Sequence, residues 1–453
     1  MGHSSPADGY PCRLLVRLVA GPCCDRFGPR KTFAGTLLLG AIPTFCSGAV
    51  TTPAGLYVVR FFIGILGGSF VPCQVWTTAF FDKNIVGTAN ALTAGIGNAG
   101  GGITYFVMPA VYVSLVNHQH LTSHLAWRIS FIVPGVLIVF MALMMLLCCP
   151  DTPTGTWSER NTHIEDNLRR HSMVGVVDIP HIGIPLDEGG ISGHVSPTSP
   201  SDADEKKDII PPTHPHFTDH EANLTVEQMM DTAQGEVIRK PTFKEFACVF
   251  ASPQTFVTGV CYFCSFGAEL AINSILGQYY GAAGQFSPKL STSQAGNYAA
   301  IFGLVNVVFR PLGGVIADYA YSRTGSVWSK KALLHIFACI TGAFLIAIGV
   351  LNSHNLGTMI GLIIGMAFFL EASNGINFSV VPHVHPYANG IVSGITGASG
   401  NLGGVVFALI FRFVPAGPTH YGHAIWIIGV ITIALNLAVC WIPPVPKRQR
   451  SDL

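Results

Sequence analysis

The chain has 453 residues, of which 49% are hydrophobic and 11% are charged, and its formal net charge is +1. Soluble domains carry about 25% charged residues, so this composition excludes an ordinary soluble domain. The near-neutral charge gives no sign of a nucleic-acid partner. Seventeen of the 24 acidic residues fall between Asp151 and Glu245. The sequence therefore predicts an all-α polytopic membrane protein with one polar insert.

Apolar runs long enough to cross a bilayer, about 20 residues in a helix, follow one another along the chain. Residues 1–10 are polar, and residues 11–24 form a short apolar run. With that short run, the chain is expected to contain about eleven transmembrane helices. The ten full runs are expected at 32–50, 54–80, 86–116, 126–149, 253–282, 294–320, 331–351, 356–382, 386–414 and 422–442.

The same pattern predicts the domain boundaries. We expect a polar N-terminus at 1–10, a helical bundle at 11–149, a polar loop at 150–250, a six-helix bundle at 251–442 and a tail at 443–453. The loop is rich in Pro, Ser, Asp and His, so we expect most of it to be disordered. Its Ser-Pro sequences can be kinase targets or simply part of a solvated linker.

Lys and Arg in the short loops predict the orientation, because cytoplasmic loops carry an excess of these residues. One set of alternating loops holds only Arg128 and Lys289, with Arg13 and Arg412 near helix ends. The other side is expected to be cytoplasmic, together with the polar loop and the C-terminus. It holds Arg26, Arg30, Lys31, Lys83, Arg323, Lys330, Lys331, Lys447, Arg448 and Arg450.

No grouping of residues indicates an enzyme or a metal site. Cys261 and Cys264 have CxxC spacing, but no second pair accompanies them, and most of the twelve cysteines lie in apolar runs. We interpret them as small packing residues. The sequence shows no nucleophile grouped with a base and no phosphate-binding loop after a strand. We therefore expect no catalytic activity, no metal and no cofactor.

Two motifs occur once in each half of the chain. The first reads R-x3-G-x3-D and comprises Arg17, Gly21 and Asp25, and then Arg310, Gly314 and Asp318. The second runs eleven residues from a glycine to an asparagine and continues x-G-G. It ends in Asn98, Gly100 and Gly101, and then in Asn401, Gly403 and Gly404. This order indicates two duplicated halves, as in many transporters whose substrate site lies between the halves.

The spacing of the first motif places its arginines deep in the membrane. Eight residues of helix separate Arg17 from Asp25 and Arg310 from Asp318, a rise of about 12 Å. A buried arginine is costly in a bilayer, so it needs a partner. One interpretation is an anion held between the two guanidinium groups. The alternative is internal pairing with Glu269 and Glu371, or with carbonyl groups.

The other polar residues in the apolar runs each have two interpretations. Asn98 and Asn401 can donate to an anion or bond a neighbouring helix, and the glycines around them allow close helix packing. Glu269 and Glu371 can carry protons, or they can be partners for the arginines. These alternatives remain open on the sequence alone.

Several stretches resemble the major facilitator superfamily. "GPCCDRFGPRK" resembles its loop motif between the second and third helices, with Gly21, Asp25, Arg26, Gly28 and Arg30 in the matching positions. "RFFIGILGG", which begins at Arg60, resembles its fourth-helix motif. "AGIGNAGGGITYFVMPA" and "GASGNLGGVVFALIFR" are similar to the paired signatures of its nitrate/nitrite porter family. The central loop resembles that of fungal members.

The resemblance implies a fold and a function. It implies twelve helices in two pseudo-symmetric bundles, alternating access, and proton-coupled transport of nitrate and nitrite in the plasma membrane. Arg17, Arg310 and Tyr262 match the family's binding residues, and Phe70 is either an aromatic wall of the site or part of the core. The family has a complete first helix before residue 13, so the chain is interpreted as lacking that helix. The alternative is a non-transporting, regulatory or degenerate paralogue.

Overall fold

The computed structural model describes residues 10–153, 155–159, 243–282, 285–286, 290–414 and 420–446. The chain divides into two compact units, one of Met1–Asn161 with Glu236–Leu453 and one of Thr162–Gly235. The second unit lies outside the described residues, as do the polar N-terminus at 1–9, most of the loop expected to be disordered, and the end of the tail. The fold described below is that of the first unit.

The first unit consists of helices, and in the described ranges the only β pairing is an isolated bridge between Thr152 and Gly155. The first group of helices comprises α1 (Tyr10–Phe27), α2 (Pro29–Cys46), α3 (Pro53–Ile63), α4 (Phe70–Phe80), α5 (Val86–Asn117), α6 (Ser123–Ser130) and α7 (Ile132–Cys148). The short helix α10 (Phe243–Phe250) precedes the second group. That group comprises α11 (Pro253–Gly281), α12 (Thr292–Leu304), α13 (Asn306–Thr324), α14 (Val327–Leu351), α15 (Leu356–Val384), α16 (Asn389–Phe413) and α17 (His420–Val439).

Local sequence signals fix many of these helix ends. Proline occupies the first turn of α2, α3 and α11, where no amide hydrogen is needed. Ser291 and Gln294 form a reciprocal capping box at the start of α12. Gly325 ends α13 in the left-handed conformation, which glycine adopts without steric cost.

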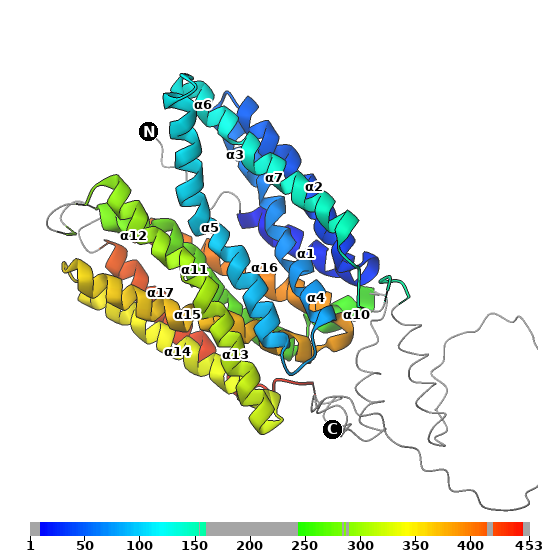
Figure 1. Ribbon diagram of the computed structural model, residues 1–453. Helices are drawn as coiled ribbons and strands as arrows, with labels where there is room; N and C mark the ends of the chain where they lie inside the picture. Colours follow the sequence, from blue (N-terminus) through cyan, green and yellow to red (C-terminus); the bar gives the residue numbers. More distant parts are fainter. Residues whose placement is uncertain are drawn as a thin grey trace, which may run out of the picture. The chain divides into compact units, whose positions relative to one another are not determined.

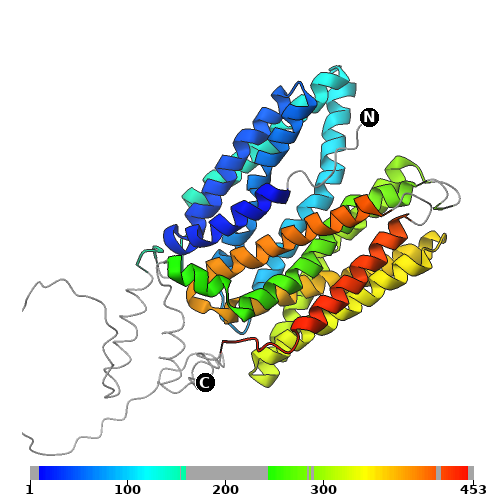
Figure 2. The ribbon, with the colours of Figure 1, turned by 180° about the vertical axis from the view of Figure 1, so that it is seen from behind.

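Ten stretches in the described residues are long and apolar enough to cross a membrane, and they coincide with the ten full runs predicted from hydropathy. Helix α1 adds a shorter eleventh helix with a proline inside it. In Figure 1 the helices α1–α7 lie on one side and α11–α17 on the other. Figure 2 shows from behind that α16 lies beside α1. The prediction of an all-α membrane protein with two related helical bundles is confirmed.

Helix α14 begins at Val327, earlier than the predicted run at 331–351, so Lys330 and Lys331 lie inside the helix and not in the loop before it. Both lie in its first turns and are 0% and 1% exposed. Lys330 donates to Asp318 at 3.0 Å, and Lys331 donates to the carbonyls of Cys440 and Ile442 after the end of α17. Hydropathy underestimates the length of such a helix, because it counts a lysine as exposed. A lysine can be buried when a carboxylate or the carbonyl groups at a helix C-terminus compensate its charge.

The duplicated glycines are packed in one half of the chain and uncovered in the other. On α16, a Cβ atom at Gly403 would meet the carbonyl of Phe263 and the backbone of Gly267 on α11. At the equivalent Gly100 and Gly101 on α5, no described atom lies within 4 Å of an added Cβ atom. The face of α5 that corresponds to the α11-binding face of α16 is therefore uncovered by the described residues.

This asymmetry predicts opposite effects for one substitution at equivalent positions. Gly403→Ala should lower the stability of the protein by about 1–3 kcal/mol, because the new methyl group overlaps backbone atoms that cannot move aside. Gly100→Ala should leave stability unchanged or raise it by up to about 1 kcal/mol through helix propensity. The thermal unfolding midpoints of the two purified variants in detergent check this. An equal loss in both variants would show that α5 is covered as α16 is.

Candidate functional site

The two aspartates of the repeated motif bind the helix starts of the opposite bundle. We call the end of the helices where α7 finishes and α10 begins the linker end. There, Asp25 on α1 accepts hydrogen bonds from the backbone N–H groups of Gly390 and Ile391 on α16, at 3.1 and 3.2 Å. Asp318 on α13 accepts from the N–H and hydroxyl of Thr88 on α5, at 2.6 and 2.8 Å. Carboxylates are stabilised at helix N-termini, so these bonds join the two bundles at this end.

Glycines make this crosswise contact possible. An added Cβ atom at Gly21 of α1 would lie 2.5 Å from the carbonyl oxygen of Gly390, and one at Gly314 of α13 would lie 2.5 Å from that of Gly87. Both glycines belong to the R-x3-G-x3-D motif, and both partners begin the second motif. The two repeated motifs therefore pack against each other across the bundle interface, α1 on α16 and α13 on α5.

Arg17 lies two turns further along α1 from Asp25 and is 5% exposed. Its Nε donates to the carbonyl of Gly67 at 2.9 Å, and its Nη1 donates to the carbonyl of Gly397 on α16 at 2.8 Å. In the part of the chain that the structure describes, it forms no ion pair. The carbonyl groups hold the guanidinium in place without neutralising its charge.

Arg310 occupies the equivalent place on α13 and is fully buried. Its Nη2 donates to the hydroxyl of Tyr262 at 2.8 Å, and its Nη1 lies 3.7 Å from Oε2 of Glu269. Its Nε and Nη1 atoms are buried and make no hydrogen bond with the described residues. Arg310 therefore has donors available for a ligand, and its pairing with Glu269 is only loose.

The same aromatic rings face both arginines. The guanidinium carbon of Arg17 lies 4.7 Å from the ring centroid of Phe70 and 5.3 Å from that of Phe266. For Arg310 these distances are 5.8 and 6.0 Å. Phe70 also packs edge-on against Phe378 and is stacked with Tyr262. The structure thus brings Arg17, Arg310, Tyr262 and Phe70 into one cluster at the interface of the bundles.

The two signature asparagines are close to this cluster but differ in their bonds. Asn401 donates to the carbonyl of Gly397 at 3.2 Å, the same oxygen that Arg17 binds. Asn98 reaches from α5 to Oε1 of Glu269 at 3.5 Å, the upper limit of a hydrogen bond. Each asparagine is therefore one contact away from an arginine of the candidate site.

The remaining motif residues lie at the linker end or on the surface. Gly28 has φ 91°, and an added Cβ atom would lie 2.9 Å from the Trp157 ring. Arg30 donates to the carbonyl of Cys149 at 2.6 Å and pairs with Asp151 at 3.4 Å. Arg26 and Arg60 are exposed. Gly28 and Arg30 support the turn between α1 and α2, and none of these four residues is among the contacts of the arginine cluster.

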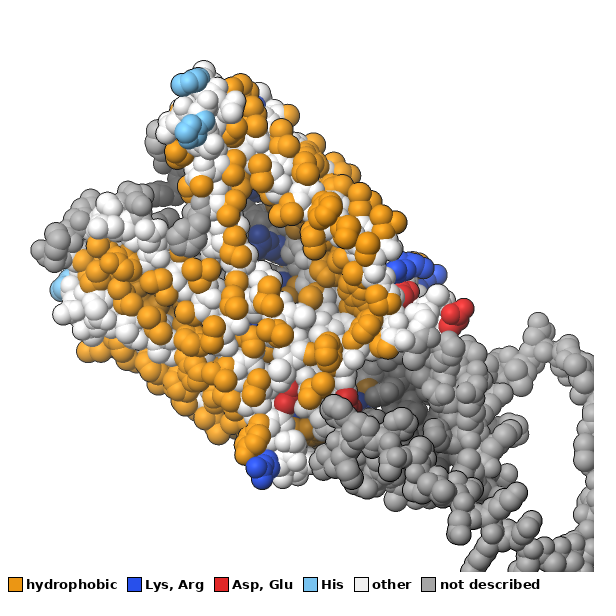
Figure 3. Space-filling view, in the orientation of Figure 1, with side chains coloured by type: hydrophobic (Ala, Val, Ile, Leu, Met, Phe, Trp, Pro, Cys, Tyr) orange, Lys and Arg blue, Asp and Glu red, His pale blue; other side chains and the backbone are white. Residues whose placement is uncertain are grey.

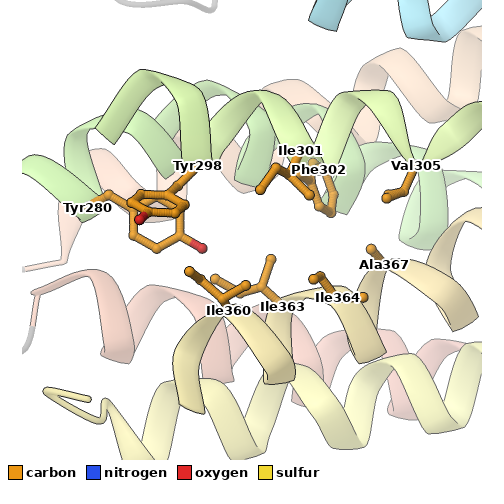
Figure 4. Close-up of a pocket in the computed structure, with 9 residues that line it drawn as sticks. All are labelled: Tyr280, Tyr298, Ile301, Phe302, Val305, Ile360, Ile363, Ile364 and Ala367. Atoms are coloured by element: carbon orange, nitrogen blue, oxygen red, sulfur yellow. The ribbon is translucent and has the colours of Figure 1, made fainter. Parts of the chain in front are cut away.

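The recesses of the protein differ in the charge of the side chains that line them. Figure 3 shows a recess beside α5 with Lys or Arg side chains at its bottom. Figure 4 shows a separate, narrow apolar crevice between α12 and α15. Its lining includes Tyr298, Phe302 and Ile363 and contains no charged side chain, so it offers nothing to bind an anion.

The motifs did not single out some polar residues near Arg310. Asn306 lies one helical turn before Arg310 on α13, and Asn374 lies one turn after Glu371 on α15. Both are almost fully buried and bind Glu269. A signal was present in the sequence, since each is an amide one turn from a charged residue in an apolar helix.

A helical membrane fold with charged groups at the interface of two related bundles defines a multi-pass membrane transporter. Residues 12–408 match the sequence family described as the Major Facilitator Superfamily, and the chain belongs to this superfamily. Its fold resembles that of a proton:xylose symporter, with a TM-score of 0.61 and 14% identity over 95% of this chain and 83% of that chain. The E. coli fucose:proton symporter gives a TM-score of 0.58 and 13% identity over 95% and 89% of the two chains.

Several curated relatives match most of the chain, among them the following two. Elsinochrome transporter 1 of Elsinoe fawcettii is 40% identical over 449 residues, 99% of this chain and 83% of that protein. High affinity nitrate transporter 2.5 of Arabidopsis thaliana is 30% identical over 433 residues, 95% of this chain and 69% of that protein. These relatives are transporters and not enzymes, which agrees with the absence of a catalytic grouping in the sequence.

Proposed function

We propose that the protein transports nitrate, and also nitrite, across the plasma membrane by alternating access with proton coupling. The observation that carries this proposal is the pair of arginines, Arg17 and Arg310, which come from opposite bundles and face the same rings of Phe70 and Phe266. The nitrate transporters among its relatives support the choice of anion.

The chemistry of the cluster suits a small planar anion. A guanidinium group is planar and gives two parallel hydrogen bonds to two oxygen atoms. Arg310 has buried donors at Nε and Nη1 that lack a hydrogen bond with the described residues, and its Nη2 donates to the Tyr262 hydroxyl. An anion between the two arginines would offset the cost of burying both charges.

The contacts at the linker end support alternating access. Asp25 and Asp318 hold the bundles together there, on the side that the Lys and Arg distribution assigns to the cytoplasm. In this state the anion would enter from the opposite side and be released after these contacts open. The central loop and the C-terminus would then be cytoplasmic. The Ser-Pro sequences, as kinase targets, lie outside the described residues.

A second candidate substrate is the one in the name of the relative from Elsinoe fawcettii, elsinochrome. The higher identity of that relative, 40% against 30%, favours it. A non-transporting paralogue is the further alternative, since the uncovered face of α5 leaves part of the first bundle unpacked by the described residues.

Transport in proteoliposomes tests these alternatives. Labelled nitrate should accumulate inside vesicles when the outer solution is acidic, and unlabelled nitrite should compete with it. Chloride at equal concentration should compete weakly, because it cannot form paired hydrogen bonds with a guanidinium group. Elsinochrome transport without nitrate uptake would favour the second candidate, and transport of neither would favour the non-transporting paralogue.

A further inference from the structure

Four buried polar side chains form a cluster beside Arg310, whose Nη2 donates to the Tyr262 hydroxyl and whose Nη1 lies near Glu269. They come from three helices of the second bundle: Glu269 from α11, Asn306 from α13, and Glu371 and Asn374 from α15. Their exposed fractions are 6%, 1%, 0% and 0%. Two carboxyl groups at this depth need compensation for their loss of hydration.

The hydrogen bonds in the cluster favour one carboxyl group over the other. Glu269 accepts from Asn306 at 2.9 Å and from Asn374 at 2.8 Å, and it also lies near Arg310. Among the described residues, Glu371 accepts one longer bond, from the same Asn374 amide, at 3.3 Å, and its carboxyl group lies against that of Glu269. Glu269 is thus the partner of the arginine and the amides, and Glu371 is poorly compensated.

The cluster has more acceptors than donors. Oε1 of Glu371, Oδ1 of Asn306 and Oδ1 of Asn374 are all buried, and none of them accepts a hydrogen bond from the described residues. Buried polar atoms are almost always paired, and leaving one unpaired costs about 1–3 kcal/mol. One oxygen of Glu371 itself and the amide oxygens of the two asparagines that bind Glu269 thus lack a donor, and a bound positive species would supply a partner for them.

The surrounding helices supply little other charge. The titratable and charged groups that face Glu371 are Glu269 on α11 and Arg310 on α13. Helices α5 and α12 contain no charged residue, and α16 carries only Arg412 in its last turn. On α14, Lys330 and Lys331 are engaged at the linker end, and His335 binds Asn436 on α17.

We propose that Glu371, together with Asn306 and Asn374, is the cation site that couples ion movement to anion transport. The cation is the proton of the proposed transport function, carried by the Glu371 carboxyl group; transport driven by sodium is the alternative outcome of the test below. The proposal rests on the proposed transport function. An anion bound to Arg310 neutralises the positive charge that otherwise compensates the two carboxyl groups. The negative charge left on the carboxyl groups then strengthens cation binding at Glu371. By linkage, the cation strengthens anion binding to the same extent.

Glu371→Gln in the full chain tests the proposal with two measurements on the same vesicles. The first is net nitrate uptake driven by an inward proton gradient without sodium, or by an inward sodium gradient at equal pH. The second is counterflow, the exchange of labelled for unlabelled nitrate, which needs no net cation movement. We expect net uptake to fall at least about tenfold, equivalent to about 1.4 kcal/mol of coupling, while counterflow persists. In the unsubstituted protein, the gradient that drives uptake identifies the cation.

Controls separate the possible outcomes. Glu159→Gln, at an exposed position where the carboxylate binds only Thr156 among the described residues, should leave both measurements unchanged. Glu371→Asp, which retains the carboxyl group, should keep part of the gradient-driven uptake. If Glu371→Gln does not fold, Asn374→Ser is measured in the same way.

Three results would overturn the cation site. The first is a folded Glu371→Gln variant that loses counterflow as well as net uptake. The second is a Glu371→Gln variant that retains both. The third is net uptake in the unsubstituted protein that no cation gradient drives. Absence of counterflow in the unsubstituted protein would instead contradict the proposed transport function itself.

Discussion

Arg310→Lys should raise the apparent KM for nitrate uptake about tenfold to hundredfold, and Arg17→Lys should have an effect of the same size. Each substitution keeps the positive charge but removes the planar pair of donors that fits two oxygen atoms of one anion. Loss of one charge-assisted hydrogen bond costs roughly 1.5–3 kcal/mol, which corresponds to this range. The measurement is the concentration dependence of nitrate uptake, with the amount of protein in the vesicles determined separately.

The matched control is Arg323→Lys. Arg323 lies in the last turn of α13, exposed, with its guanidinium carbon 5.2 Å from the ring centroid of Tyr319, so nitrate affinity should not change. Arg17 also binds carbonyl groups of η3 (Gly64–Ser69) and α16. The unfolding temperature of Arg17→Lys must therefore be compared with that of the parent protein. Normal affinity in both Arg17→Lys and Arg310→Lys would leave these arginines as structural residues and remove the anion site.

Hydropathy alone predicted the membrane helices, because a helix facing lipid has to be apolar over the whole bilayer thickness. The boundaries agree within a few residues: the run expected at 356–382 is α15, Leu356–Val384, and the run at 253–282 is α11, Pro253–Gly281. The run expected at 331–351 began too late, because α14 begins at Val327 and includes Lys330, whose charge is compensated by Asp318 on α13. That partner lies on another helix, so no local pattern reveals it.

The repeats predicted that Arg17 and Arg310 are equivalent, but not how their motifs pack. A duplication shows which residues correspond between the halves, whereas the crossed pairing of α1 with α16 and α13 with α5 is a property of the assembled fold. The same limit applies to Asn306 and Asn374. Their positions one turn from charged residues were visible in the sequence, but their common partner Glu269 is on another helix. The roles of these residues in transport remain predictions.

The equivalent helices α5 and α16 differ in how their glycines are packed, which neither the repeats nor hydropathy predicts. Gly400, Gly403 and Gly404 are packed against Tyr262, Phe263, Gly267 and Leu270 of α11, whereas Gly97, Gly100 and Gly101 have no described neighbour. Tyr262 is also the residue that binds Arg310. The first bundle therefore has no described counterpart of the helix that supports the arginine in the second bundle, which makes the transport measurement decisive for this chain.

Asp318→Asn should destabilise the protein strongly, by about 3–5 kcal/mol, because it leaves a buried lysine without its counter-charge. Asp318 accepts from Lys330 at 3.0 Å, and Lys330 is 0% exposed and also lies 3.3 Å from Nε2 of His383. The substitution also removes the carboxylate that binds Thr88 at the start of α5, so the contact between the bundles at the linker end should weaken.

Thermal unfolding of the purified variants in detergent measures the loss, and a second substitution identifies its cause. In the double variant Asp318→Asn, Lys330→Met, the uncompensated charge is absent, so a large part of the stability should return, although the bonds to Thr88 are still changed. Glu159→Gln, at an exposed position where the carboxylate accepts from Thr156, should shift the unfolding temperature little. If the double variant is as unstable as Asp318→Asn, the bonds to Thr88 and not the charge of Lys330 determine the effect, and the linker-end contact depends mainly on the capping of α5.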